Sequence, residues 1–197
     1  MAITWQQVKL HWDRVLYLDE INGFRDIVGN ATSERRAELQ DDLRNSEAIA
    51  SGGPDELQDF HSFIDEEMIA NDAIAELVHE LSLLALMKKV EIRLTHVLRK
   101  KVPAYANRQK ISFGDYRTAV GDAVYGTLPE RVHFRELLLI CNCIKHNGKV
   151  SKDLASSFPA WVEGREMTGL DTAYDRLRDN VIKFVYAYVS AIYAAHP

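Results

Sequence analysis

The stretch of sequence that decides the fold is PDELQDFHSFIDEEMIANDAIAELVHELSLLALMKKVEIRLTHVLRKKV, residues 54–102. Between Pro54 and Pro103 the chain contains neither proline nor glycine, and its apolar residues recur every three or four positions. This spacing places the apolar side chains on one face of a helix. The pattern therefore predicts one long helix over this span, or two helices with a joint near Asn71.

Helical spacing continues on both sides of this stretch. The sequence predicts a first helix from about residue 5 to Gly29, with Trp5 and Trp12 in the core, and a charged helix from Thr32 or Ser33 to about residue 51. The sequence predicts four further helices, over residues 112–125, 129–146, 151–157 and 170–195, of which 151–157 is short and polar. No alternating strand pattern occurs. We expect an all-α fold, a bundle of five to seven helices with long antiparallel members in a single domain over residues 1–197.

Composition and cysteine content narrow the class of protein. The chain has 197 residues, 47% of them hydrophobic, and a formal net charge of -5, as expected of a globular protein. Its two cysteines, Cys141 and Cys143, cannot form a secreted disulfide framework, so we expect a cytoplasmic protein. The first residues do not resemble a signal peptide, and the apolar stretch 181–195 is short and contains Lys183. We expect no membrane association.

Charge is unevenly distributed along the chain. Residues 13–80 contain 18 acidic and 5 basic side chains, whereas residues 88–117 contain 9 basic and 2 acidic ones. Aromatic residues are interleaved with this basic segment, a pattern typical of nucleic-acid binding. We predict RNA contacts by the basic side chains of Arg99, Lys100, Lys101, Arg108 and Lys110. In the alternative interpretation, the basic segment is a solvated helix end that pairs with acidic groups of the same chain or of a partner.

Two Glu-x-x-His pairs raise the question of a metal site. Glu76 with His79, and Glu130 with His133, have the spacing found in di-iron carboxylate bundles. However, Thr127 and Glu130 form a predicted capping box, which would turn the Glu130 carboxylate toward the backbone. A di-metal bundle is therefore the least favoured alternative, and we expect no metal and no other cofactor.

The two cysteines also do not indicate a metal or nucleophile site. On a helix Cys141 and Cys143 point about 200° apart, so they cannot share an ion. Cys143 and His146 are three residues apart and could touch. Cysteines in an apolar helix usually serve packing, so this interpretation is favoured over a Cys-His nucleophile.

A polar cluster ends the helix expected over residues 129–146. Residues 137–144 are apolar almost all the way round the helix, which predicts a position at the centre of the bundle. Asn142 and His146 are four residues apart and share one face, and Lys145 lies beside them. An amide and an imidazole in such a helix need polar partners. They are either a structural hydrogen-bonded pair or part of a functional site.

The segment LICNCIKHNG, residues 139–148, resembles the C-terminal motif helix of the HEPN superfamily. These are all-α domains that often dimerise, and many are metal-independent ribonucleases of toxin, antiphage and RNA-processing systems. Their motif has an arginine, commonly a polar residue such as asparagine after it, and a histidine further along. Asn142 matches the polar position and His146 matches the histidine, whereas Cys141 occupies the position of the arginine.

Two hypotheses about function follow. In the first, which the resemblance implies, a HEPN-like domain binds or cleaves RNA as a homodimer of a toxin or phage-defence system, with an antitoxin or another protein as a further partner. His146 would then move the proton of the 2′-hydroxyl, Lys145 would hold the phosphate and Asn142 would orient one of them. In the second hypothesis, the chain is a non-catalytic helical module for dimerisation and protein interaction. The cysteine in place of the motif arginine favours the second hypothesis.

Overall fold

The computed structural model describes residues 4–49 and 53–197, and all regular elements in this part of the chain are helices. One isolated antiparallel bridge joins Lys149 and Glu166. The predicted all-α helical bundle is thus confirmed. The chain divides into two compact units. We call Met1–Leu18 with Leu83–Pro197 the motif unit, and Asp19–Ser82 the hairpin unit. That the whole chain forms one HEPN-like domain stays a prediction.

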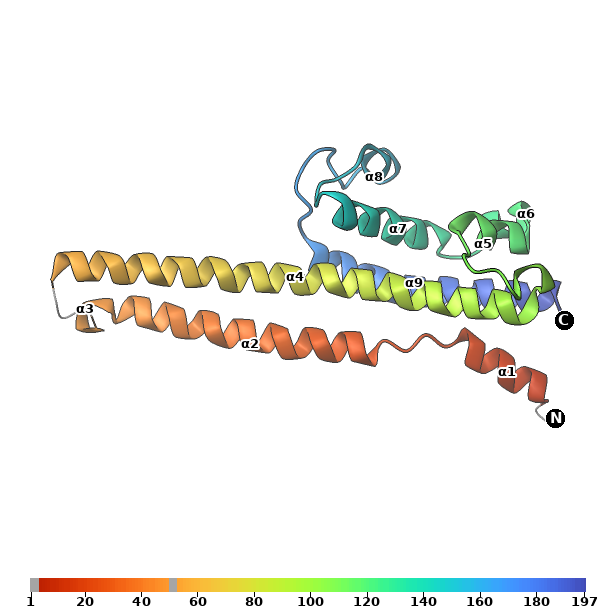
Figure 1. The fold of residues 1–197 in the computed structure, drawn as a ribbon, viewed down its shortest axis with the longest axis horizontal. Helices are drawn as coiled ribbons and strands as arrows, with labels where there is room; N and C mark the ends of the chain where they lie inside the picture. Colours follow the sequence, from red (N-terminus) through yellow and green to blue (C-terminus); the bar gives the residue numbers. More distant parts are fainter. Residues whose placement is uncertain (1–3, 50–52) are drawn as a thin grey trace. The chain divides into compact units, whose positions relative to one another are not determined.

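The hairpin unit contains α2 (Asp19–Arg44), the short α3 (Ser46–Ile49) and the first part of α4 (Pro54–Lys101) (Figure 1). The motif unit contains α1 (Trp5–Arg14), the rest of α4, the 3-10 turn η1 (Pro103–Tyr105), α5 (Phe113–Val120), α6 (Asp122–Thr127), α7 (Arg131–His146), α8 (Lys152–Ser157) and α9 (Leu170–Ala195). The helix predicted after Pro54 is one continuous helix, since α4 has no joint at Asn71. The Asn71 side chain donates a hydrogen bond to the carbonyl oxygen of Thr32 in α2 (3.0 Å).

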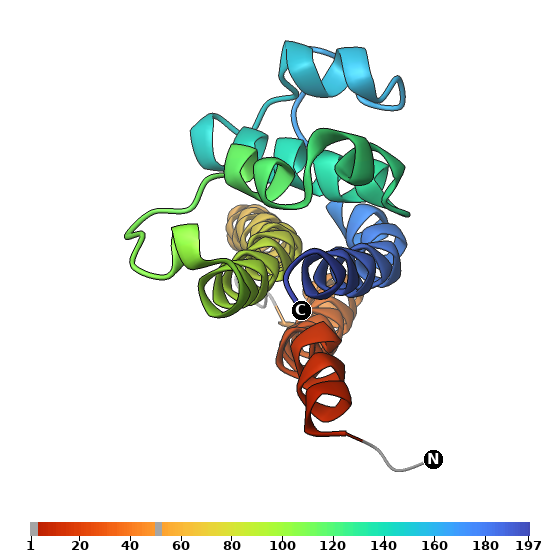
Figure 2. The same ribbon diagram turned by 90° about the vertical axis from the view of Figure 1, so that its right-hand side faces the viewer.

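The core of the motif unit is built around α9. Figure 2 shows α9 among α1, α5, α7 and the C-terminal part of α4. The side chains of Phe184 and Tyr188 are fully buried, and the Phe184 ring stacks on the ring of Phe134 from α7 at 4.4 Å between centroids. The Tyr188 hydroxyl donates a hydrogen bond to the carbonyl oxygen of Tyr116 in α5 (2.9 Å). These contacts make α9 the central helix.

The expectation that α7 would be the central helix is wrong. Phe134, Leu137 and Ile140 are buried, but Arg135 and Asn142 on the opposite face are exposed. Leucines at positions 138 and 139 are half-buried at the borders of the two faces. An apolar run can therefore belong to a helix that is covered on one side only.

The predictions for the N-terminal region are also wrong. Residues 15–18 interrupt the expected first helix, and α2 then continues through Gly29 and Thr32, where a helix end and a new start were expected. Trp5 and Trp12 are 80% and 59% exposed instead of lying in the core. The physical reason is that Leu16 and Leu18, in the non-helical connection, are buried in place of the tryptophans.

A buried carboxylate fastens α1 to its neighbours. Asp13 accepts a hydrogen bond from Lys100 Nζ of α4 (2.6 Å) and another from the Tyr193 hydroxyl of α9. Burial alone would raise the pKa of Asp13, but the two hydrogen bonds and the positive charge of Lys100 outweigh it, so this pKa lies below its ordinary value. Burial and the carboxylate of Asp13 raise the pKa of Tyr193. α1 is thus held mainly by polar contacts.

A second buried carboxylate joins α7, α9 and the loop between α8 and α9. The Glu136 side chain accepts two hydrogen bonds from the Arg176 guanidinium (both 2.7 Å) and one from the Trp161 indole Nε1 (2.9 Å). Burial alone would raise the pKa of Glu136, but these donors and the charge of Arg176 lower it below its ordinary value. The same pairing raises the pKa of Arg176.

In the hairpin unit, α2 and the first part of α4 are antiparallel. Contacts of residues later in α2 and in α3 fall on residues earlier in α4: Thr32 meets Asn71, Arg35 meets Glu67 (2.9 Å), and Ser46 meets His61 (2.8 Å). Among the residues of this unit that the structure describes, the buried apolar side chains are few, namely Ile21, Leu39, Ile64 and Val78. This part of the chain therefore has a small apolar core.

We expect Glu136→Gln to lower the free energy of unfolding by about 2 kcal/mol, because it leaves Arg176 without its carboxylate partner. Urea denaturation followed by circular dichroism measures this change. Glu166→Gln is the control, since Glu166 is exposed and forms only a 3.5 Å ion pair with Lys149. The pKa of Glu136 is lowered in the folded state from its ordinary value of 4.5. The loss of unfolding free energy caused by Glu136→Gln should therefore be complete at a pH well above this value and become smaller as the pH falls below it. Equal effects of both substitutions would contradict this role of Glu136.

Candidate functional site at the end of α7

The polar cluster predicted as a site lies at the surface. Asn142, Lys145 and His146 are all exposed on the outer face of α7. Within residues 4–49 and 53–197, no hydrogen bond or ion pair holds these three side chains, so solvent satisfies their polar groups. The interpretation as a buried, hydrogen-bonded structural pair is therefore wrong, and the His146 imidazole is accessible to a ligand.

The backbone at the end of α7 fixes the position of this cluster. The helix ends at His146, and the N–H groups of Asn147 and Gly148 both bond to the carbonyl oxygen of Cys143 (3.2 and 3.0 Å). Gly148 has a φ of 67°, a left-handed conformation that favours glycine. The carboxyl end of a helix is its negative pole, which favours cations such as Lys145 there.

The residue in the arginine position of the HEPN motif cannot replace an arginine. Cys141 is fully buried, and its thiol points toward α4, where it donates to the carbonyl oxygen of Leu83 (3.5 Å). Burial raises the pKa of Cys141 to about 12, so the thiol is neutral and carries no charge to a phosphate. Cys143 is also buried and accepts the N–H of Ser151 (3.4 Å), so the two thiols face different neighbours, as helix geometry predicts.

Most of the basic side chains predicted to contact RNA also have contacts within the motif unit. The Arg99 guanidinium donates to the carbonyl oxygens of Arg108 (2.9 Å) and Gln109 (3.0 Å) and thereby holds the loop after η1. Lys100 is paired with Asp13, and the Lys101 ammonium lies 4.4 Å from the centroid of the Tyr193 ring. These three side chains therefore stabilise the fold.

Of the other two residues predicted to contact RNA, Arg108 has an ion-pair partner within the motif unit, whereas Lys110 is exposed. Arg108 forms an ion pair with Asp115 (2.6 Å) and lies over the Tyr105 ring. Lys110 is exposed, and it borders a hollow of about 370 Å³ between α4 and the loop before α5, together with Lys88, Arg99 and Tyr116. This hollow brings three cations from separate parts of the basic segment together with one carboxylate, that of Glu91, which lies 3.7 Å from the Lys88 ammonium.

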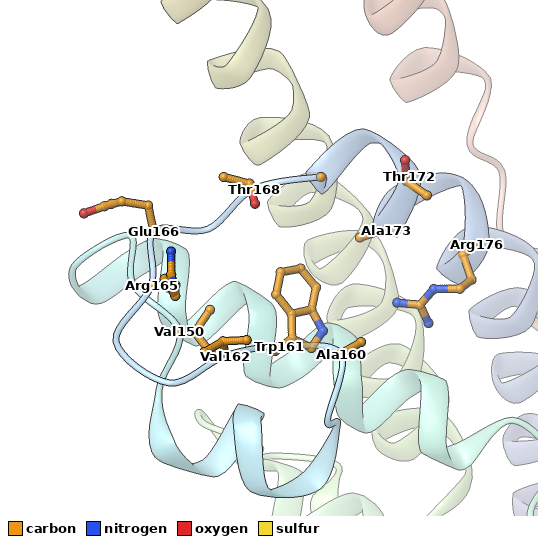
Figure 3. Close-up of a pocket in the computed structure, with 11 residues that line it drawn as sticks. Val150, Ala160, Trp161, Val162, Arg165, Glu166, Thr168, Thr172, Ala173 and Arg176 are labelled. Carbon is orange, nitrogen blue, oxygen red and sulfur yellow. The ribbon is translucent and has the colours of Figure 1, made fainter.

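A larger hollow of about 520 Å³ lies between Val150, the loop after α8 and the start of α9 (Figure 3). Its lining includes Trp161, Arg165 and Arg176, none of which sequence analysis selected as functional residues. The only signal in the sequence is a tryptophan followed by an arginine in a loop. The contacts that form the hollow join residues far apart in the chain, so this signal could not locate it.

The structure assembles no metal-ligand set from the Glu-x-x-His pairs. In the part of the chain that is described, no three His, Cys, Asp or Glu side chains are placed to hold one metal ion. Glu130 Oε2 lies 2.6 Å from His133 Nδ1, and among the described residues no third ligand joins this pair.

The predicted capping box at Thr127 and Glu130 is also wrong. Glu130 itself precedes α7 with a left-handed φ of 57°, and the Thr127 hydroxyl donates to the carbonyl oxygen of Val124 (2.9 Å).

Comparisons of the chain with protein-family models, with curated proteins and with solved structures give no significant match. Among the described residues, no helix has the length and apolar character needed to cross a membrane. Functional interpretation therefore depends on the chain's own residues and contacts.

We expect both thiols to be unreactive in the native protein, because Cys141 and Cys143 are buried and the pKa of Cys141 is raised. Titration with a thiol-reactive dye in mildly alkaline buffer should label neither cysteine until denaturant is added. The denatured protein, in which both thiols react, is the internal control. Rapid native labelling of Cys141, identified by peptide mapping, would show that this position is accessible to a phosphate after all.

Proposed function

We propose that the chain is a non-catalytic helical interaction module whose hairpin unit binds a basic amphipathic helix of a partner protein. The observation that supports this proposal is a patch of exposed apolar side chains on the two antiparallel helices of that unit. We call it the hairpin patch; it consists of Phe24, Ile27, Ile74, Leu77 and Leu81, which are 41–71% exposed.

The α4 part of the hairpin patch has the spacing of a helix-packing seam. Ile74, Leu77 and Leu81 follow one another at steps of three and four residues, the pattern that lines one face of a helix. At about 100° per residue, this face lies roughly a quarter turn from the buried face that carries Ile64 and Val78. The α4 helix therefore has one apolar face toward α2 and a second one toward solvent.

The α2 part of the patch lies beside it. The contact between Thr32 and Asn71 sets the register of the antiparallel pair, and it places Phe24 and Ile27 level with the region of Leu77. On α2, Phe24 and Ile27 lie about a quarter turn from the buried face, in the same sense of rotation as the exposed apolar residues of α4. Because the two helices are antiparallel, both sets of side chains lie on the same side of the pair. The hairpin patch thus forms an apolar surface shared by two helices, against which a third amphipathic helix can pack.

The net negative charge of the hairpin unit indicates which kind of partner helix it binds. Residues 19–82 contain 17 acidic and 4 basic side chains. Arg35, Arg36 and Arg44 are already paired with Glu67, Asp72 and Asp41. A second copy of the hairpin unit would bring two strongly acidic surfaces together, which opposes association. A helix with one apolar face and flanking Lys or Arg matches both the apolar hairpin patch and the negative charge around it.

We expect a fluorescein-labelled peptide of about 18 residues, with Leu at steps of three and four and Lys elsewhere, to bind the protein. The double variant Leu77→Ser, Leu81→Ser should weaken binding at least about tenfold, because it removes two buried apolar contacts. Fluorescence anisotropy measures the affinity. Ile69→Ser is the matched control, since Ile69 is 69% exposed on another side of the same helix.

Several results would contradict this proposal. One is equal binding of a peptide with Glu in place of Lys, and another is an equal loss of affinity in the Ile69→Ser control. Absence of saturable binding of the Lys peptide also contradicts it. Sedimentation velocity tests whether a second copy of the chain covers the hairpin patch instead. If the parent is a dimer and the Leu77→Ser, Leu81→Ser variant is a monomer, the patch is a dimer interface and the proposal is contradicted.

RNA binding by the motif unit is a second candidate function, and the three cations around the 370 Å³ hollow favour it. Lys88 and Lys110 approach this hollow from α4 and from the loop, and Arg99 lies between them in the chain. The HEPN resemblance adds His146 as a base for the 2′-hydroxyl and implies that two copies of the motif meet in a dimer. Because Cys141 is buried and neutral, we propose binding without cleavage.

For this second candidate, we expect salt-dependent binding of single-stranded RNA in the presence of EDTA. Lys88→Ala with Lys110→Ala should lower the slope of log affinity against log salt by about 1.4, since two phosphate contacts are lost. Lys152→Ala, an exposed lysine of α8, is the control. No binding in low salt would eliminate the RNA candidate. Cleavage by the parent that His146→Ala abolishes would establish a ribonuclease and overturn the non-catalytic proposal.

A further inference from the structure

The hollow of about 520 Å³ in the motif unit has the size and lining of a small-molecule site (Figure 3). Val150, Ala160, Val162 and Ala173 supply apolar surface, and the indole of Trp161 stands in the hollow between them. Flat aromatic surfaces of this kind bind planar ligands by stacking. The shape and lining therefore favour a planar, largely apolar ligand.

The Trp161 ring is held in place by a buried network. Its Nε1 donates to Glu136, a side chain only 4% exposed, whose two oxygens also bind Arg176. The loop that carries Trp161 is fastened by backbone hydrogen bonds from Val150 to Arg165 (2.8 Å) and from Gly164 to Val150 (2.9 Å). A wall that is already ordered loses little conformational entropy when a ligand binds.

The charges around the hollow leave one cation without compensation. The charge of Arg176 is neutralised by Glu136, and Glu166 is paired with Lys149. Arg165 is exposed on the rim, and its guanidinium has no hydrogen-bond or ion-pair partner among the residues that the structure describes. A guanidinium can bind a carboxylate with two parallel hydrogen bonds.

We propose that this hollow binds a planar organic monoanion of the aromatic carboxylate class. The aromatic body of the ligand stacks on Trp161, and its carboxylate meets Arg165 on the rim of the hollow. One free cation matches one negative charge. A dianionic phosphate ester would place its second charge near the carboxylate of Glu166 without a cation to balance it.

The test is isothermal titration calorimetry with 2-naphthoate and with the neutral 2-naphthamide. The parent should bind the carboxylate about fivefold to tenfold more tightly than the amide, the range expected for one partly exposed charge-assisted contact. Arg165→Ala should remove this preference while leaving the affinity for the amide unchanged. Lys152→Ala removes one positive charge from α8 outside the hollow and should behave as the parent.

A second measurement locates the ligand. With Trp5→Phe and Trp12→Phe, which change two exposed tryptophans, Trp161 is the only remaining tryptophan, and its fluorescence should be quenched saturably by 2-naphthoate. The proposal is overturned by the absence of saturable binding at millimolar ligand, by equal affinity for acid and amide, or by an Arg165→Ala variant that keeps the preference. Tighter binding of 2-naphthyl phosphate than of 2-naphthoate would also overturn it.

Discussion

The carboxylate of Glu136 is the group on which the arrangement of the motif unit depends most. A charge in the apolar core costs several kcal/mol unless it is fully paired. The bidentate contact with Arg176 and the N–H of Trp161 supply that pairing, and each comes from a different segment. The network therefore fixes α7 against α9, and with them both the exposed end of α7 and the wall of the neighbouring hollow.

Local signals in the sequence were sufficient for α9 but not for residues 112–125, where the one predicted helix is wrong: α5 and α6 are separated at Gly121, which has a φ of 82°. The bounds of α9 agree with the predicted range 170–195, and the uninterrupted α4 is one of the two alternatives that the absence of proline and glycine after Pro54 left open. The N-terminal helix could not be predicted in this way. Helical spacing continues through residues 15–18, and only tertiary burial of Leu16 and Leu18 decides that the chain turns there.

The candidate site was predictable in its position along the chain but not in its environment. The sequence places Asn142, Lys145 and His146 at the end of a helix, and the structure does so too. Their exposure depends on which face of α7 meets α9, and residues far away in the chain determine this face. In the same way, only the fold reveals that Lys100 is paired with Asp13, 87 residues distant.

The same pairings bear on the choice between the two functions. Lys100, Arg108 and Arg117 of the basic segment have Asp13, Asp115 and Asp122 as partners. These carboxylates lie outside residues 19–82, so the three ion pairs lie within the motif unit. Within the hairpin unit, 17 acidic side chains outnumber 4 basic ones, and this excess favours a basic partner. In α7, by contrast, the position that the HEPN resemblance aligns with the phosphate-binding arginine is Cys141, a buried neutral thiol. The electrostatics of the chain thus favour binding of a basic protein helix over cleavage of RNA.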